Sequence, residues 1–187
     1  MQLTEEKELL EKIKADPNGF SVLFDLHYHK IFRYIFRRVV DYDASRDIAA
    51  ETFMKAFIKI NSFRWTGISI SSWLFRIATN EINQYFRKQK YAPESLNELT
   101  ENYRFDFANP QTWEEEKQAL EKELNDHREF LQVQHHLKHF ELKYQEVIAL
   151  RYFENKSIKE IAEITGKNEG TIKSLLSRGM EKLRQLM

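Results

Sequence analysis

The chain has 187 residues, no cysteine, and 29 basic against 29 acidic side chains. The absence of cysteine excludes disulfides, thiolate nucleophiles and the usual cysteine-rich zinc sites. No apolar run approaches the roughly 18 to 20 residues that cross a bilayer, and the charged start MQLTEEKELLEKI is unlike a signal peptide. We therefore expect a cytoplasmic, helix-rich globular protein without a membrane span.

The net charge of zero hides an uneven distribution. Between Phe20 and Lys90 the basic side chains outnumber the acidic ones by twelve to six, whereas acidic residues dominate between Tyr91 and Phe130. A basic segment is typical of proteins that bind the phosphates of nucleic acids. The neutral sum therefore does not exclude a nucleic-acid partner.

The first part of the chain is predicted to form three or four helices. The turn residues Asp16-Pro17-Asn18-Gly19 predict a short leading helix before them and a new helix from Phe20. The new helix has a stripe of residues that is expected to be buried, at spacings of three and four: Phe20, Leu23, Phe24, His27, Ile31, Tyr34 and Ile35. Another helix follows the acidic start at 41–43, with a stripe of Ile48, Thr52, Phe53, Ala56, Phe57 and Ile60.

The segment FRWTGISISS, residues 63–72, lacks a helical period and predicts a loop. A last helix of this part runs from Trp73 to the cationic end RKQK at 87–90, where positive charge suits a helix C-terminus. Residues 1–90 are thus predicted as one helical domain, residues 91–112 as a linker, and residues 113–187 as a second helical domain. The fold class is all-α.

The stretch SIKEIAEITGKNEGTIKSLLSRG, residues 157–179, has the spacing of a helix-turn-helix. Ala162 is the small residue at the helix crossing, Gly166 is the turn glycine, and the apolar residues that hold the helices together are Ile158, Ile161, Ile172 and Leu176. Hydroxyl and cationic side chains remain for the outer face of the second helix, where they could reach phosphates and base edges. An ordinary helical hairpin with a solvated face is the alternative.

Three stretches together resemble the extracytoplasmic-function group of bacterial sigma-70 factors. YQEVIALRYFENKSIKEIAEITGKNEGTIKSLLSRGMEKLR resembles sigma region 4, and DYDASRDIAAETFMKAFIKINSF resembles the polymerase-binding helix of region 2. SSWLFRIATNEINQYFRKQK resembles the promoter-melting helix of region 2. The resemblance implies a transcription initiation factor, without catalytic residues, cofactor or metal, whose partners are core RNA polymerase, promoter DNA and an anti-sigma factor.

The resemblance also implies three sets of site residues. For core polymerase they are Asp47, Ile48, Ala50, Glu51 and Met54, while Phe53 and Phe57 are expected in the core. For the minus-10 element they are Arg64, Trp65, Ser69, Ser71 and Ser72 in the loop, and Arg76, Asn80, Gln84, Arg87 and Lys88 on the helix. For the minus-35 element they are Thr171, Lys173, Ser174, Ser177 and Arg178.

Several positions depart from the family pattern. Leu175 and Met180 stand where cations are frequent, which predicts fewer phosphate contacts, and Lys167 stands where an apolar residue is common. Glu141-Leu142 replaces a frequent proline pair, so we expect the acidic helix from Trp113 to run unbroken into region 4.

Two further features admit a plain interpretation. The acidic run WEEEKQALEKELNDHRE is a solvated helix face or, alternatively, a cover for a basic DNA-binding face in the free protein. His135, His136 and His139 have no cysteine or well-placed carboxylate that would complete a metal site, and we expect them to be ordinary surface residues.

The rival function is a stand-alone, dimeric operator-binding regulator, which leaves the region 2 resemblance unexplained.

Overall fold

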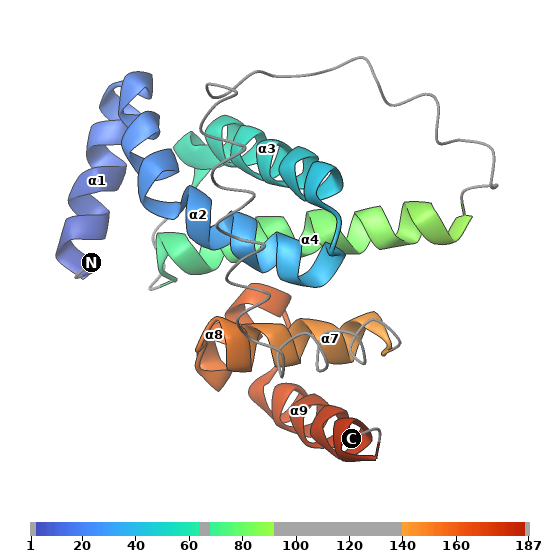
Figure 1. The fold of residues 1–187 in the computed structure, drawn as a ribbon. Helices are drawn as coiled ribbons and strands as arrows, with labels where there is room; N and C mark the ends of the chain where they lie inside the picture. Colours follow the sequence, from blue (N-terminus) through green and yellow to red (C-terminus); the bar gives the residue numbers. More distant parts are fainter. Residues whose placement is uncertain (1–2, 64–67, 92–139, 186–187) are drawn as a thin grey trace.

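The computed structural model describes residues 3–63, 68–91 and 140–185. Every regular element in these ranges is a helix, which confirms the predicted all-α class (Figure 1). The first group comprises α1 (Leu3–Ala15), α2 (Phe20–Val39), α3 (Tyr42–Lys59) and α4 (Ile70–Tyr91), with 3-10 turns at Pro17–Gly19 and Ile60–Ser62. The second comprises α7 (Leu142–Ile148), a π-helical continuation at Ala149–Phe153, α8 (Ile158–Thr165) and α9 (Glu169–Arg184).

The boundary between α2 and α3 is set by local backbone chemistry. Val40 takes a left-handed conformation, with φ 59°, and its N–H donates to the carbonyl of Phe36. Asp41 then caps α3, because its carboxylate accepts a hydrogen bond from the Ala44 N–H at 2.8 Å. These two residues reverse the chain, and α2 and α3 pack against each other.

The core of the first group follows the predicted stripes, with one exception. Leu23, Ile31, Tyr34 and Ile35 of α2 are all at most 1% exposed. Aromatic rings from the two helices interleave between α2 and α3, as in the edge-on pair of Phe24 and Phe53. Phe53 is buried as predicted.

Phe57 is the exception, because its side chain is 47% exposed. Its ring meets that of Phe20 edge-on, with 5.2 Å between the centroids, near the end of the helix pair. The expectation that Phe57 lies in the core was therefore wrong, although Ile60 one turn later is only 3% exposed. The apolar period marks a side of the helix, but it does not show how fully each side chain is covered.

The second group is built around the close approach of α7 and α9. Gly179 is buried between them, and a β-carbon placed there would lie 3.0 Å from Cδ1 of Ile148. The absence of a side chain at Gly179 thus allows α9 to lie close to α7. Ile161 of α8 and Ile172 of α9 are fully buried, in agreement with the predicted helix-turn-helix packing.

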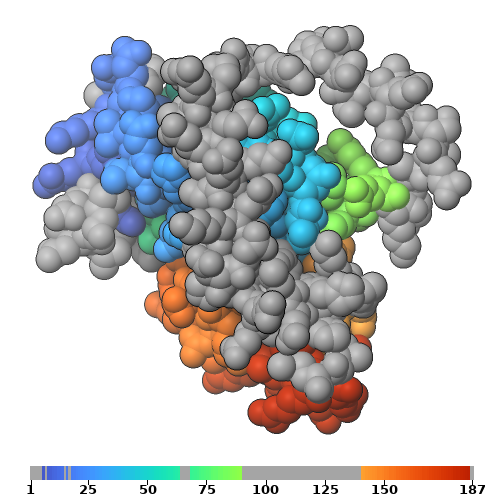
Figure 2. Space-filling model, in the orientation of Figure 1, coloured from blue at the N-terminus to red at the C-terminus, as the bar shows by residue number. Residues whose placement is uncertain are grey.

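The two groups share one continuous hydrophobic core. Helix α8 packs against α4, and the π-helical turn packs against α2. In Figure 2 the surface of the C-terminal helices lies directly against that of the N-terminal ones.

Two predicted boundaries need correction. Helix α4 begins at Ile70, three residues before the predicted start at Trp73, because Ser69 caps it. Glu141 has an extended backbone, with φ −59° and ψ 139°, and α7 begins afresh at Leu142. The expectation of an unbroken helix into region 4 was therefore wrong at Glu141.

None of the helices in the described ranges is long and apolar enough to span a bilayer.

Candidate nucleic-acid interface

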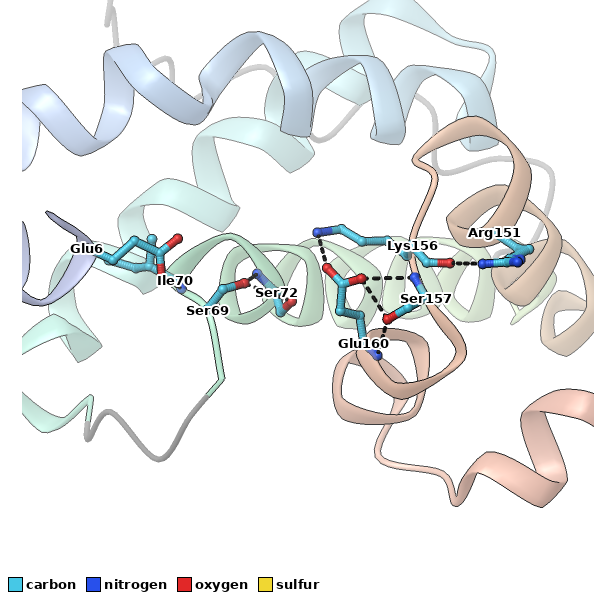
Figure 3. A network of polar contacts seen from close by, with 8 residues as sticks. All are labelled: Glu6, Ser69, Ile70, Ser72, Arg151, Lys156, Ser157 and Glu160. Atoms are coloured by element: carbon cyan, nitrogen blue, oxygen red, sulfur yellow. Dashed lines mark hydrogen bonds and ion pairs between the residues drawn. The ribbon is translucent and has the colours of Figure 1, made fainter. Parts of the chain in front are cut away.

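The helix-turn-helix is fixed at both ends of α8 by local hydrogen bonds. Ser157 and Glu160 form a capping box, in which the Ser157 hydroxyl accepts from the Glu160 N–H and the Glu160 carboxylate accepts from the Ser157 N–H (Figure 3). Burial alone would raise the pKa of Glu160, but hydrogen bonds from Ser157 and Lys156 hold it below its usual value. Gly166 ends α8 in the left-handed region, with φ 69°, and its N–H donates to the carbonyl of Ala162.

Helix α9 presents the predicted outer face. Asn168 caps it by accepting hydrogen bonds at 2.8 Å from the Thr171 N–H and the Thr171 hydroxyl. This cap fixes where the helix starts, and the burial of Ile172, Leu175 and Leu176 sets which residues point outward. The five residues predicted for duplex DNA are all exposed: Thr171, Lys173, Ser174, Ser177 and Arg178.

Two departures from the family pattern have structural explanations. Leu175 is 8% exposed and belongs to the hydrophobic core, so this position holds α9 in place. The expectation of fewer phosphate contacts stays a prediction. Lys167 pairs with the buried Glu146 of α7, with 3.5 Å between Nζ and Oε2. This ion pair explains why a cation is accommodated beside the turn.

Helix α4 carries the second candidate face. The predicted residues are all exposed along it: Arg76, Asn80, Gln84, Arg87 and Lys88. Their spacing places Arg76, Asn80, Gln84 and Arg87 on one side of the helix, and these side chains mix cations with amides. Such a face can bind both phosphate oxygens and unstacked bases.

A buried polar network holds the opposite side of α4 against α2. Arg38 is only 5% exposed, and its guanidinium donates to the Tyr34 hydroxyl and to the Asn83 side-chain oxygen, both at 3.3 Å. The Tyr34 hydroxyl in turn lies 2.8 Å from that of Thr79. Burial raises the pKa of Tyr34, against the opposing charge of Arg38. The network fixes the rotation of α4 and so the direction of its exposed face.

The predicted loop residues divide into three cases. Arg64 and Trp65 lie outside the described residues. Ser69 and Ser72 form the N-terminal cap of α4, where the Ser69 hydroxyl accepts from the Ser72 N–H at 3.1 Å (Figure 3). Ser72 is 1% exposed, so its predicted contact with an unstacked base needs correction to a capping role. Ser71 is half-buried.

The aromatic Trp73 supports α4 from the side of the preceding turn. Its ring lies 4.7 Å, between centroids, from that of Phe63, and it packs against the core while remaining partly exposed. Its ring therefore contacts the fold.

Helix α3 provides the third candidate surface. Asp47 is exposed, and Ala50, Glu51 and Met54 are half-buried. Ile48 is 7% exposed and packs in the core, so the prediction that its side chain contacts polymerase needs correction. It follows Asp47 directly, about 100° further round the helix, and faces the core.

Sequence reasoning missed the apolar end of this surface. Ile58 is 69% exposed, and it lies on the same helix face as Asp47, Glu51 and Met54 at spacings of three and four. Phe57 adjoins it. Two large exposed hydrophobic side chains that extend a predicted binding face indicate a surface that a partner covers. Apolar periodicity alone could not separate Phe57 from the core, whereas Ile58 lies outside the predicted apolar stripe.

No group of three metal-binding side chains occurs in the part of the chain that the structure describes. The acidic run from Trp113 and the histidines His135, His136 and His139 lie outside the described residues.

The two halves of the chain match two family descriptions in the order that the sequence predicts. "Sigma-70 region 2" matches residues 23–91, and "Sigma-70, region 4" matches residues 131–183. The ECF RNA polymerase sigma factor SigW of Bacillus subtilis is 30% identical over 190 residues, covering 99% of this chain and 97% of SigW. The chain is an extracytoplasmic-function sigma factor of the sigma-70 family.

Other relatives agree with this assignment. The ECF RNA polymerase sigma-E factor of Haemophilus influenzae is 32% identical, with coverage of 96% of this chain and 93% of the relative. The ECF sigma factor BldN of Streptomyces coelicolor is 29% identical over 96% of this chain, which spans only 65% of BldN.

Two solved structures share the fold. CnrH in complex with the cytosolic domain of CnrY superposes with a TM-score of 0.67 at 18% identity, covering 97% of this chain and 96% of CnrH. The sigma factor RpoE of Bartonella quintana, in complex with the anti-sigma factor NepR, has a TM-score of 0.61 at 22% identity, covering 89% of this chain and 95% of RpoE.

Proposed function

We propose that this sigma factor binds core RNA polymerase in the cytoplasm and directs it to promoters that carry separate minus-35 and minus-10 elements. The observation that carries the proposal is the pair of exposed polar faces, one on α9 and one on α4. Helix α9 is held by its buried residues Ile172 and Leu175, and α4 is held by the buried network of Arg38. The proposed boundaries are residues 1–90 for region 2, 91–112 for the linker and 113–187 for region 4.

Duplex recognition is assigned to α9. A recognition helix enters the major groove with its N-terminal residues toward the bases, and Thr171 and Lys173 lie in the first turns of α9. Arg178 lies further along the exposed side, where a guanidinium can bind a phosphate or form a bidentate contact with guanine. The mixture of hydroxyl groups and cations suits both kinds of contact.

Strand opening is assigned to α4 and the segment before it. Separated strands expose bases whose edges suit the amides of Asn80 and Gln84, and a displaced backbone suits Arg76 and Arg87. Arg64 and Trp65 complete this proposal from the preceding segment. The exposed positions on α4 support the assignment.

Polymerase binding is assigned to the outer face of α3, with Asp47, Glu51 and Met54 extended by Phe57 and Ile58. Lys55 forms ion pairs with Glu51, at 3.0 Å, and with Glu81 of α4, at 2.7 Å. These pairs hold Glu51 in a defined position beside the exposed apolar groups. A patch of apolar groups edged by carboxylates is typical of a specific protein interface.

An anti-sigma factor is a further proposed partner, because RpoE was solved with one. Within the chain itself, the acidic run from Trp113 is a second proposed cover for the basic DNA-binding face of the free protein. Neutralising its glutamates should raise the DNA affinity of the free protein, and unchanged affinity would remove the idea.

A footprinting experiment tests the function. Genomic fragments are exposed to the protein alone, to core polymerase alone and to both, and protected DNA is sequenced. We expect protection at two spaced elements only with both proteins. Protection by the protein alone, at paired half-sites with the spacing of a dimer, would instead support an operator-binding regulator.

A further inference from the structure

Helix α1 brings a buried carboxylate to the first residue of α4. Glu6 is only 6% exposed, and its Oε2 atom accepts a hydrogen bond from the Ile70 N–H at 3.2 Å (Figure 3). The first N–H groups of a helix have no acceptor within the helix, and they carry positive partial charge that favours an anion. Helix α4 has no acidic residue in its own first turn, so the carboxylate comes from an element 64 positions away in the sequence.

Glu6 and Ser69 serve different N–H groups of the same helical turn. The Ser69 hydroxyl accepts from the Ser72 N–H at 3.1 Å, and the Ser69 carbonyl accepts from the Trp73 N–H at 3.0 Å. Neither contact uses the N–H of Ile70, and Glu6 is the acceptor for that group. Because Ile70 is fully buried, water would be a poor substitute for this acceptor.

The position of Glu6 is set by the apolar residues of α1. Leu10 and Ile13 are each 2% exposed, and together with Glu6 they lie on one face of α1 at spacings of four and three. Burying a carboxylate costs more free energy than burying a leucine, even when the carboxylate has a partner. Packing alone therefore does not account for a glutamate at this position, which indicates a role for its acceptor oxygens.

Helix α1 also connects the two described ends of the segment that precedes α4. It packs against the 3-10 turn at Ile60–Ser62, and through Glu6 it binds the start of α4. The rings of Phe63 and Trp73, 4.7 Å apart between centroids, join the same two ends. The start of α4 is therefore held in a defined position relative to the preceding turn.

We propose that Glu6 is a positioning residue for strand opening: through the Ile70 N–H it holds the first turns of α4, with Ser71 and Arg76, in the orientation that receives an unstacked base. The proposal rests on the function proposed above. The Glu6 carboxylate is buried, so it acts through α4 and does not itself contact DNA. Groups that are already held in the bound orientation lose less conformational entropy when the base arrives, which is the source of the expected effect.

Three variants separate the acceptor from the packing. Glu6→Leu keeps the volume and removes the acceptor, Glu6→Gln keeps an acceptor oxygen without the charge, and Glu8→Leu makes the first change at an exposed position of α1. Amide hydrogen exchange in the free protein reports the contact directly. We expect the Ile70 N–H to exchange about tenfold faster in Glu6→Leu than in the native protein, and to stay protected in the other two variants.

The effect on function is measured with core polymerase, on a promoter that the native protein opens. The binding constant of the initial complex and the rate of strand opening are measured separately, the rate from the time course of permanganate reactivity. We expect Glu6→Leu to slow opening about three- to tenfold with initial binding unchanged, Glu6→Gln to restore most of the rate, and Glu8→Leu to match the native protein. A variant that merely folded less well would lose binding and opening in proportion.

Three results would overturn the role of Glu6. One is native-like opening by Glu6→Leu, and another is an unchanged exchange rate of the Ile70 N–H in that variant. The third is an equal loss of initial binding and opening in Glu6→Leu, which would reduce Glu6 to a support of the fold. A native protein that opens no promoter would instead contradict the function proposed above, and the role of Glu6 with it.

Discussion

Two glycines four residues apart should respond in opposite directions to the same substitution. Gly166 has φ 69°, where an L-residue with a β-carbon is strained by about 1 to 2 kcal/mol. The nearest atom to a β-carbon there is 3.9 Å away, so the cost of Gly166→Ala comes from the backbone alone. We expect Gly166→Ala to lower the free energy of unfolding by about 1 to 2 kcal/mol.

Gly170 lies in the first turn of α9, and a β-carbon there would approach only Asn168 Oδ1, at an ordinary 3.6 Å. Alanine restricts the unfolded chain more than glycine does, so Gly170→Ala should raise the free energy of unfolding by about 0.4 to 1 kcal/mol. Gly166→Asn should cost less than Gly166→Ala, because asparagine tolerates the left-handed region better. Urea denaturation followed by circular dichroism measures all three, and equal signs for the two alanine variants would refute the assigned turn geometry.

The remaining predictions concern binding and pH. Arg178→Ala should weaken binding of the polymerase complex to duplex with the minus-35 element by about 1 to 3 kcal/mol, and a gel-shift titration showing no change would remove its proposed role. Arg76→Ala with Asn80→Ala should reduce permanganate-detected strand opening more than polymerase binding; equal losses would indicate a damaged fold. Ile58→Ser should weaken polymerase binding about tenfold in a pull-down titration while the unfolding free energy changes by no more than about 0.5 kcal/mol. Burial, with Lys30 and Lys156 nearby, lowers the pKa of His27 from 6.5 to about 4. The unfolded chain then takes up this proton first, so stability should fall as pH drops from 6.5 toward 4, and His27→Gln should flatten that part of the curve; an unchanged slope contradicts the assignment.

Much of the fold could be predicted because its signals are local. The period of Leu23, Ile31 and Ile35 fixes the buried side of α2, and the left-handed turn at Gly166 follows from a glycine between two amphipathic segments. The outer face of α9 is then set by the helix period. These features depend on residues within a few turns of one another.

The wrong predictions concern residues whose type and spacing are compatible with two structural roles. Ile48 was predicted to contact a partner and Phe57 to lie in the core, yet Ile48 is buried and Phe57 is exposed, because coverage depends on neighbouring elements that the helix period does not show. The serines Ser69 and Ser72 suit either a base pocket or a helix cap, and the cap is what the structure contains. Residue type alone does not separate these alternatives.

The contact between the two halves had no sequence signal at all. Arg37 and Glu154 are 117 positions apart, and the π-helical turn that presents Glu154 has no distinctive composition. The extended backbone at Glu141 likewise has no glycine or proline that would predict it. Such features follow from tertiary packing, which a single sequence does not display.

The most direct test of the proposed function is transcription in vitro. Fragmented genomic DNA is transcribed by bacterial core polymerase with and without the protein, and the 5′ ends of the products are sequenced. We predict starts that depend on the protein and share two spaced upstream elements. If core polymerase is neither bound nor redirected to new starts, the proposed role in promoter recognition is contradicted.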